Sequence, residues 1–231
     1  MRQYLSLDNE VWTTEVCIFM NPTLIGYFPR RQAGTPCGFP RPGAPNVTEI
    51  ASVGHYTSEG PPNWIDQWRH NEMWFFDSEA LARKVIAEAI QIDIEPDPQR
   101  DPPWRVKLSR EAGRGYDFYA YKMFPYRFVQ GRQEDYDLSG LNCEPLSADY
   151  ERLGYDAVNR TGCAHLECSP LFCNGRAGDI PVNRFCLIDE PERALALAQE
   201  FSGSNGSGCE PGDYFALEVW RKSSSKGGAA Q

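Results

Sequence analysis

Two segments of this chain have the spacing of an amphipathic helix with strand-like residues on either side, and this arrangement restricts the possible folds more than any other feature. The first segment predicts a helix over about residues 77–92, because Asp77 or Ser78 can cap the free amide groups of a first turn. Apolar side chains then recur at helical spacing and form one face, which we expect to be buried. The residues of that face are Leu81, Val85, Ile86, Ala89 and Ile90.

The second segment predicts a helix over about residues 189–201. Asp189 and Glu192 have the spacing of a capping box, and Pro191 falls in the first turn, where the missing amide donor of proline costs nothing. These two helices are the main helical elements that the sequence predicts. The expected buried face of the second consists of Ala194, Leu197, Ala198 and Phe201.

The two helical segments resemble each other in their surroundings. Each is preceded by a strand-like run and followed by a turn-rich connection and another strand-like run. Aligning Asp77 with Asp189 also pairs the apolar and acidic positions of the helices: Ala82 with Ala194, Val85 with Leu197, and Glu88 with Glu200. One interpretation is a duplicated strand-helix-strand unit, which within one sheet would form a right-handed parallel crossover. The alternative is the similarity that any two amphipathic helices flanked by strands share.

Strand-like residues occupy more of the chain than helical ones. The last strand-like run has Phe215, Leu217 and Val219 on one side and Tyr214, Ala216, Glu218 and Trp220 on the other. The pattern predicts an α+β protein with a mixed or mostly antiparallel sheet, with an α/β arrangement as the alternative. The expected strands lie at 11–20, 24–28, 104–108, 117–129 (one or two strands, broken by Pro125), 184–188 and 213–220.

The length of 231 residues suits a single domain, which we place at residues 1–221. Seven prolines and five glycines lie between Pro29 and Pro62, a density that neither a central strand nor a helix interior tolerates. We therefore expect a long Pro/Gly-rich loop at 29–63, either an ordered cover or a mobile segment. The serine- and glycine-rich residues 222–231 predict a disordered tail.

Charge and hydropathy exclude several classes of partner. The formal net charge of -9 disfavours nucleic-acid binding, which depends on neutralising phosphates with cations. No apolar run approaches the roughly 18–20 residues that span a bilayer, so no membrane span is expected. Acidic residues interrupt the first ten positions, which therefore lack the apolar stretch of a secretory signal. The expectation is an acidic, soluble protein of the cytoplasm.

The residues best suited to bind a metal or to take part in catalysis are four cysteines and a histidine near the middle of the C-terminal half. Thiolate and imidazole are the ligands that zinc prefers, so this cluster is a candidate structural zinc site. The spacing matches no paired C-x-x-C pattern, and an iron–sulfur cluster lacks the usual ferredoxin spacings. The candidate zinc ligands are Cys163, His165, Cys168 and Cys173, with Cys186 following.

Three other interpretations of the cysteines remain open. Cys168 or Cys173 is a candidate nucleophile, with His165 as the base that would form the thiolate. Cys17 and Cys186 are better interpreted as buried thiols with a purely structural role, because both lie among large apolar residues. Disulfides are a further alternative that requires an oxidising compartment.

Aromatic residues supply the remaining clue. Trp64, Trp68 and Trp74 lie close together after the Pro/Gly-rich stretch, and aromatic side chains are enriched in binding faces. Burial in the core is the alternative for all three. From the sequence we expect a binding protein, for a protein partner or a small ligand, with a cysteine-rich structural element that holds zinc. The alternative function is a thiol-dependent enzyme.

Overall fold

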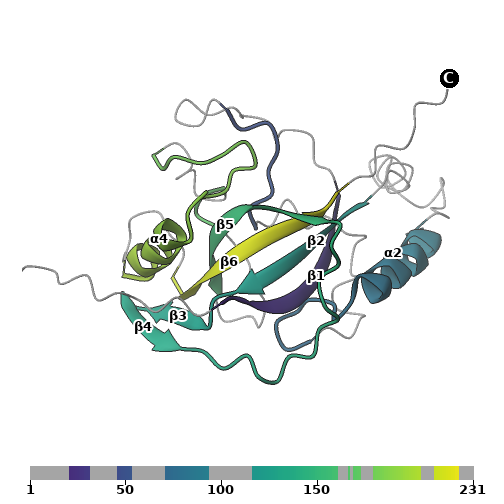
Figure 1. Cartoon of the computed structure of the whole chain (residues 1–231), viewed down its shortest axis with the longest axis horizontal. Helices are drawn as coiled ribbons and strands as arrows, with labels where there is room; N and C mark the ends of the chain where they lie inside the picture. Colours follow the sequence, from purple (N-terminus) through teal and green to yellow (C-terminus); the bar gives the residue numbers. More distant parts are fainter. Residues whose placement is uncertain are drawn as a thin grey trace, which may run out of the picture.

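Six strands and two helices make up the described part of the computed structural model, which covers residues 21–31, 46–53, 71–93, 116–160, 166, 169–172, 179–203 and 211–223 (Figure 1). This confirms the predicted α+β class with two main helices. The strands are β1 (Thr23–Arg31), β2 (Tyr116–Met123), β3 (Tyr126–Val129), β4 (Arg132–Asp135), β5 (Tyr150–Arg160) and β6 (Asp213–Lys222), and the helices are α2 (Glu79–Asp93) and α4 (Pro191–Gly203).

All the strand pairs in the sheet are antiparallel. Strand β6 is central: β5 pairs along its whole length on one side, whereas β2 and β3 share the other side. Strand β1 extends the sheet beyond β2, and β4 extends it beyond β3. The buried residues of β6 explain its position, since Tyr214 to Val219 are all nearly inaccessible to solvent.

Both helices pack on the same face of the sheet, at opposite ends of it (Figure 1). The even-numbered residues of β2 and β6 share this face, because the register pairs Ala120 with Trp220. Helix α2 places Ala82 and Val85 with Ala120 in one buried cluster. In a separate cluster, α4 places Ala194 and Leu197, among others, against Tyr214 and Ala216.

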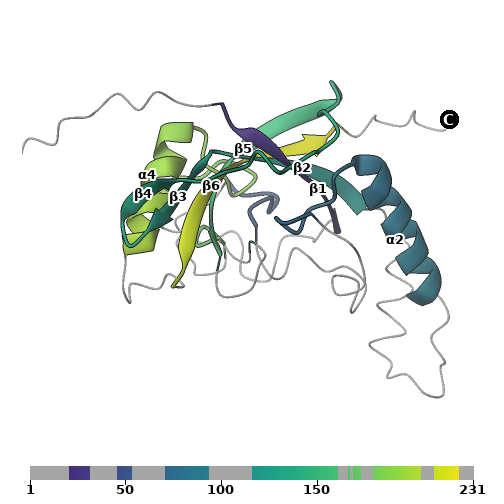
Figure 2. The ribbon, with the colours of Figure 1, turned by 90° about the horizontal axis from the view of Figure 1, so that it is seen from below.

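Loops cover the opposite face, on which the odd-numbered residues of β2 and β6 lie. Tyr121 and Leu217 belong there to a cluster with side chains from several irregular segments. Segment 46–53 passes beneath the strands when the sheet is viewed almost edge-on (Figure 2). The covering side chains include Ala51, Val53, Met73, Phe75, Phe185 and Leu187.

The entry to α2 is a tight turn built around the side chain of Asn71. Its Oδ1 accepts hydrogen bonds from the amides of Met73 and Phe75, at 3.0 and 3.1 Å. Its Nδ2 donates to the carbonyl of Ile25 in β1 and to Oδ1 of Asp77. The turn then pairs with β1 through one bridge, in which Phe76 and Tyr27 exchange both backbone hydrogen bonds.

The entry to α4 repeats this turn atom for atom. Oδ1 of Asn183 accepts from the amides of Phe185 and Leu187, and its Nδ2 donates to the carbonyl of Leu153 in β5 and to Asp189. Ile188 and Tyr155 exchange the two bridge hydrogen bonds. The left-handed residue is also repeated: Trp74 has φ 63° and Cys186, at the corresponding place, has φ 59°.

A glycine in each edge strand makes room for its asparagine turn. Gly26 of β1 and Gly154 of β5 have φ of 136° and 150°, and each lies at a register shift in its strand. A Cβ on Gly26 would lie 2.7 Å from the carbonyl oxygen of Phe76, and one on Gly154 would lie 2.8 Å from that of Ile188. Glycine is therefore required at both positions for steric and conformational reasons.

These matches support the duplication that the helices suggested. One unit runs from β1 through the Asn71 turn and α2 to β2, and the other from β5 through the Asn183 turn and α4 to β6. Because the equivalent strands β2 and β6 pair antiparallel, the units are related by an approximate two-fold axis perpendicular to the sheet.

The predicted parallel crossover between neighbouring strands is wrong in one respect. Phe76 and β2 do run in the same direction, with α2 between them, but β1 is inserted between the two and pairs antiparallel with both. The second unit inserts β5 in the same way, between Ile188 and β6. The predicted strand at 184–188 is accordingly reduced to a turn with a single bridge, because the Asn183 side chain takes the amides that a ladder would use.

The start of α2 and the extent of the strands differ in part from the sequence-based expectations. Ser78 caps α2 by accepting a hydrogen bond from the amide of Leu81 at 3.1 Å, but Leu81 itself is 37% exposed rather than buried. Strand β1 continues through Pro29 to Arg31, into the stretch predicted as a loop, because the amide-free Pro29 lies in an edge strand. Strands β4 and β5 were not predicted, and the strands expected at 11–20 and 104–108 lie outside the described residues.

We predict that Asn71→Ala and Asn183→Ala destabilise the protein by similar amounts, about 2–4 kcal/mol each, because each removes the four hydrogen bonds of the turn, three of which are partly buried. Urea denaturation followed by circular dichroism measures the free energy of unfolding. Asn142→Ala, at an exposed loop position, is the matched control and should change it little. A large loss from only one of the two turn variants would contradict the equivalence of the units.

Candidate functional site

Between α2 and α4, the middle of the helix-bearing face of the sheet is partly exposed to solvent. We call this region the central strip. The register brings its residues together from all four long strands, since Leu24 pairs with Lys122 in β1 and β2, Lys122 with Glu218 in β2 and β6, and Arg152 with Trp220 in β5 and β6. Cross-strand partners point to the same face of a sheet. The members of the central strip are Leu24, Lys122, Arg152, Glu218 and Trp220.

Glu218 is the polar centre of the central strip. Its side chain is 9% exposed, and Oε2 accepts a hydrogen bond of 2.9 Å from the indole Nε1 of Trp220. Nζ of Lys122 lies 4.0 Å from the same oxygen, and Nη1 of Arg152 lies 3.7 Å from Oε1. One carboxylate thus lies between two cations, both of which are more exposed than it is, at 27% for Lys122 and 49% for Arg152.

Aromatic rings hold the two cations in place. Nζ of Lys122 lies 4.6 Å from the centre of the Trp220 ring, and the guanidinium of Arg152 lies 5.1 Å from that of Tyr155. Arg152 also donates to the Tyr155 hydroxyl at 2.7 Å. Tyr155 is buried beside Phe124, so its ring is fixed by the core beneath α4. The result is a partly aromatic surface with two ordered cations, formed by β2, β5 and β6.

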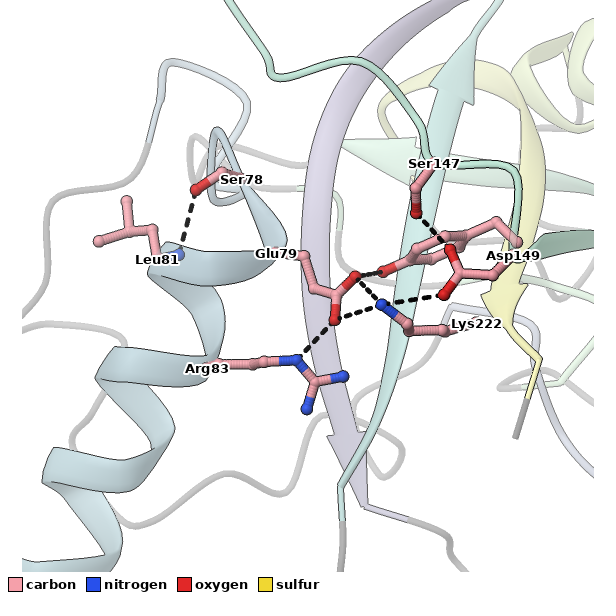
Figure 3. Close-up of polar contacts among 8 residues, drawn as sticks. Ser78, Glu79, Leu81, Arg83, Ser147, Asp149 and Lys222 are labelled. Atoms are coloured by element: carbon pink, nitrogen blue, oxygen red, sulfur yellow. Dashed lines mark hydrogen bonds and ion pairs between the residues drawn. The ribbon is translucent and has the colours of Figure 1, made fainter. Parts of the chain in front are cut away.

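An ion-pair cluster fixes α2 at one end of the central strip (Figure 3). Glu79, in the first turn of α2, accepts hydrogen bonds from Nζ of Lys222 at 2.8 and 3.0 Å and from the Tyr150 hydroxyl at 3.1 Å. Arg83 binds the same carboxylate at 2.5 Å, and Asp149 pairs with Lys222 at 3.1 Å. Lys222 and Tyr150 belong to the second unit, so this cluster binds the helix of the first unit to the strands of the second.

The ionised state of Glu79 is favoured by these contacts. Burial alone would raise the pKa of the carboxyl group, but the hydrogen bonds from Lys222, Arg83 and Tyr150 outweigh it and lower the pKa. The negative charge in the first turn is also favourable to the helix dipole. This cluster therefore has a structural role in positioning α2.

A second polar cluster lies on the opposite, loop-covered face. Asp156 of β5 is fully buried and accepts hydrogen bonds from the amide of Val53 at 2.7 Å, the amide of Ala157 at 2.9 Å and the hydroxyl of Ser169 at 2.5 Å. The amide of Ser169 in turn donates to the carbonyl of Val53. Asp156 thus joins segments 46–53 and 169–172 to the sheet.

Arg30 fixes the same loop from the other unit. Its Nη1 donates to the carbonyls of Ala51 and Ser52, at 2.7 and 3.1 Å, while the guanidinium stacks on Tyr119 and Tyr121. Within the described residues, Arg30 Nε, Ser52 Oγ and Tyr121 Oη are buried without a hydrogen-bond partner. Segment 46–53 is consequently a link between the two units, because its last three residues contact both Arg30 of the first unit and Asp156 of the second.

Burial raises the pKa of Asp156 to about 6, against the lowering effect of its hydrogen bonds from Ser169 and Val53 and of the Arg30 charge. The folded protein therefore binds a proton at this site over a pH range in which the unfolded chain has already released it. The favourable contribution of this group is complete below pH 3.8 and is lost as the pH rises to about 6.

Most of the predicted site residues lie outside the described part of the chain. This applies to the whole candidate metal and catalytic set and to two of the three tryptophans: Cys163, His165, Cys168, Cys173, Trp64 and Trp68. Among the residues that the structure describes, no group of histidine, cysteine and acidic side chains could hold a metal ion. The zinc site and the thiol pair thus stay predictions.

Trp74 and Cys186 are described, and they occupy corresponding places in the two turns. Trp74 is partly buried, and its amide donates to the carbonyl of Asn71 at 2.9 Å. Cys186 is buried as expected, and its thiol donates to the carbonyl of Leu171. Both residues have a left-handed backbone that the turn requires, so the structure gives each a clear local role.

Sequence reasoning missed the central strip as a site. The alternation in β6 correctly placed Glu218 and Trp220 on one side of their strand, and this was the available signal. Lys122 and Arg152 come from strands that only the tertiary fold brings next to β6. Arg152 also lies in β5, whose glycine-containing pattern did not predict a strand.

Comparison with known proteins adds no relative: no family model, no curated protein and no solved structure matches the chain. In the described part of the chain, neither helix has the length and apolar character needed to cross a bilayer.

We predict that Asp156 makes the stability of the protein depend on pH in a specific direction. The free energy of unfolding of the wild type, relative to Asp156→Asn, should fall by about 2 kcal/mol between pH 4 and pH 7, because the carboxyl group is neutral in the folded state up to about pH 6. Urea denaturation at a series of pH values measures the difference. A difference that stays constant across this range would contradict the raised pKa.

Proposed function

We propose that the protein is a binding protein and that the central strip holds a segment of a protein partner. The observation that carries the proposal is the set of partly exposed side chains, one tryptophan and two cations, on the sheet face between two helices. Tryptophan and arginine are the residue types most enriched among those that dominate binding energy at protein interfaces.

The rigidity of the central strip supports this function. Lys122, Glu218 and Trp220 lie on β2 and β6, which are hydrogen-bonded on both sides, and Arg152 lies on β5, which pairs with β6 along its length. The rings of Trp220 and Tyr155 hold the two cations in defined positions. A surface whose side chains are already ordered loses less conformational entropy when a partner binds. The two helices border the strip, and the Glu79 cluster keeps α2 in place.

The loop-covered face is a weaker candidate for the same function. Arg30, Asp156 and Ser169 have at most 5% of their surface exposed. Arg30 and Asp156 bind backbone groups of segment 46–53, and the Ser169 hydroxyl donates to the Asp156 carboxylate. A partner would have to displace segment 46–53 to reach them. We therefore assign these residues to the connection between the two units.

The experiment is site-specific photo-crosslinking in cell extract. Benzoylphenylalanine is introduced in place of Leu24, at the border of the central strip, or in place of the exposed Arg132 on β4 as a control position. We expect a defined crosslinked partner from position 24 alone, and its loss when Trp220→Ala is added. Circular dichroism and thermal unfolding check that each variant is folded. Crosslinks that are equal at both positions, or unaffected by Trp220→Ala, would exclude the central strip as the binding face.

A further inference from the structure

We infer that the partner segment is acidic, with carboxylates that bind Lys122 and Arg152 and an apolar side chain that packs on Trp220. This inference rests on the proposed function and specifies its partner. It further assigns to Glu218 the role of an internal competitor, a carboxylate that occupies the place between the two cations when the partner is absent.

The local charge of the central strip favours an acidic partner. The strip has two cations and one carboxylate, in a chain whose formal net charge is -9. Its local net charge is therefore positive, opposite in sign to the net charge of the chain. Complementary charge determines which partners bind an interface and how fast they associate.

The geometry of the two ion pairs leaves both cations able to bind a further carboxylate. Lys122 and Arg152 lie 4.0 and 3.7 Å from the Glu218 oxygens, which is close enough for attraction but beyond hydrogen-bond distance. Shorter, charge-assisted hydrogen bonds to an incoming carboxylate would be stronger than these contacts. Glu218 is itself held back by its hydrogen bond to the indole of Trp220 and is only 9% exposed, so an incoming carboxylate would approach the cations from the solvent side.

The ring of Trp220 is partly exposed beside both cations. Lys122 lies over this ring, so the aromatic surface and the charge form one continuous site. Leu24 extends the apolar part toward β1 through its register with Lys122. An acidic segment with alternating or adjacent apolar residues would complement both the cations and the aromatic surface, whereas a basic segment would be repelled by both cations.

The test uses two fluorescein-labelled peptides of equal length, one of glutamate and leucine and one with lysine in place of glutamate. Fluorescence anisotropy measures the Kd of each for the full chain. We expect the acidic peptide to bind at least about tenfold more tightly than the basic one. Lys122→Gln and Arg152→Gln should each weaken its binding by about three- to tenfold, and added salt should weaken it further.

Glu218→Gln provides the sharpest comparison. It removes the competing charge but keeps an oxygen that accepts from the Trp220 indole, so the Kd for the acidic peptide should fall severalfold. Glu72→Gln and Arg132→Gln change the net charge by the same amounts at exposed positions outside the central strip, and should leave the Kd within about twofold. Thermal unfolding confirms that the five variants remain folded.

The outcomes separate this inference from the proposed function. Weaker or unchanged binding by Glu218→Gln, or equal binding of the basic peptide, would overturn the acidic partner. If the acidic peptide does not bind while the Leu24 crosslink still depends on Trp220, the central strip binds a partner of another chemistry, and only this inference fails. If the crosslink is also absent, both proposals fail.

Discussion

The fold depends on a single type of interaction, an asparagine side chain that organises a turn and attaches it to the edge of the sheet. In both Asn71 and Asn183, the side-chain oxygen accepts hydrogen bonds from two backbone amides of the turn, and the side-chain nitrogen donates to a strand carbonyl and to an aspartate. The amide therefore satisfies backbone groups that would otherwise be left unpaired where the chain enters a helix. Gly26 and Gly154 permit the close approach that these hydrogen bonds need.

Several features of the molecule follow from the repeated turn. Each turn covers part of an edge strand and so blocks its pairing with other chains. Two residues after each bridge, the edge strand also lacks a free amide donor. In β1 this position is Pro29, which has no amide hydrogen, and in β5 it is Ala157, whose amide donates to the Asp156 carboxylate. The remaining edges, those of β2 and β6, pair with each other and join the two units. Because the axis between them is perpendicular to the sheet, both helices lie on one face and leave its centre accessible.

The sequence predicted the parts of this structure that depend on local pattern. Both helices, the buried face of α4 and the alternation in β6 follow from residue spacing, and the alignment of Asp77 with Asp189 indicated the duplication. The asparagine turns were not recognised, because asparagine is common in turns and the strand carbonyls that it binds lie 46 and 30 residues away in the chain. Strand β5 was missed because Gly154 and the buried Asp156 and Asn159 interrupt its apolar pattern. The central strip required the register of four strands, which no local pattern contains.

Amide hydrogen exchange measured by NMR tests the central claim most directly, namely that two equivalent units are closed by the same turn. Phe76 and Ile188 lie outside the strands, yet each donates a 2.8–3.0 Å hydrogen bond to the facing edge-strand residue. The account predicts that these two amides exchange as slowly as those of their partners, Tyr27 and Tyr155, and with similar protection in both units. Exchange of the Phe76 and Ile188 amides at the rate of the exposed loop around Asn142 would contradict it.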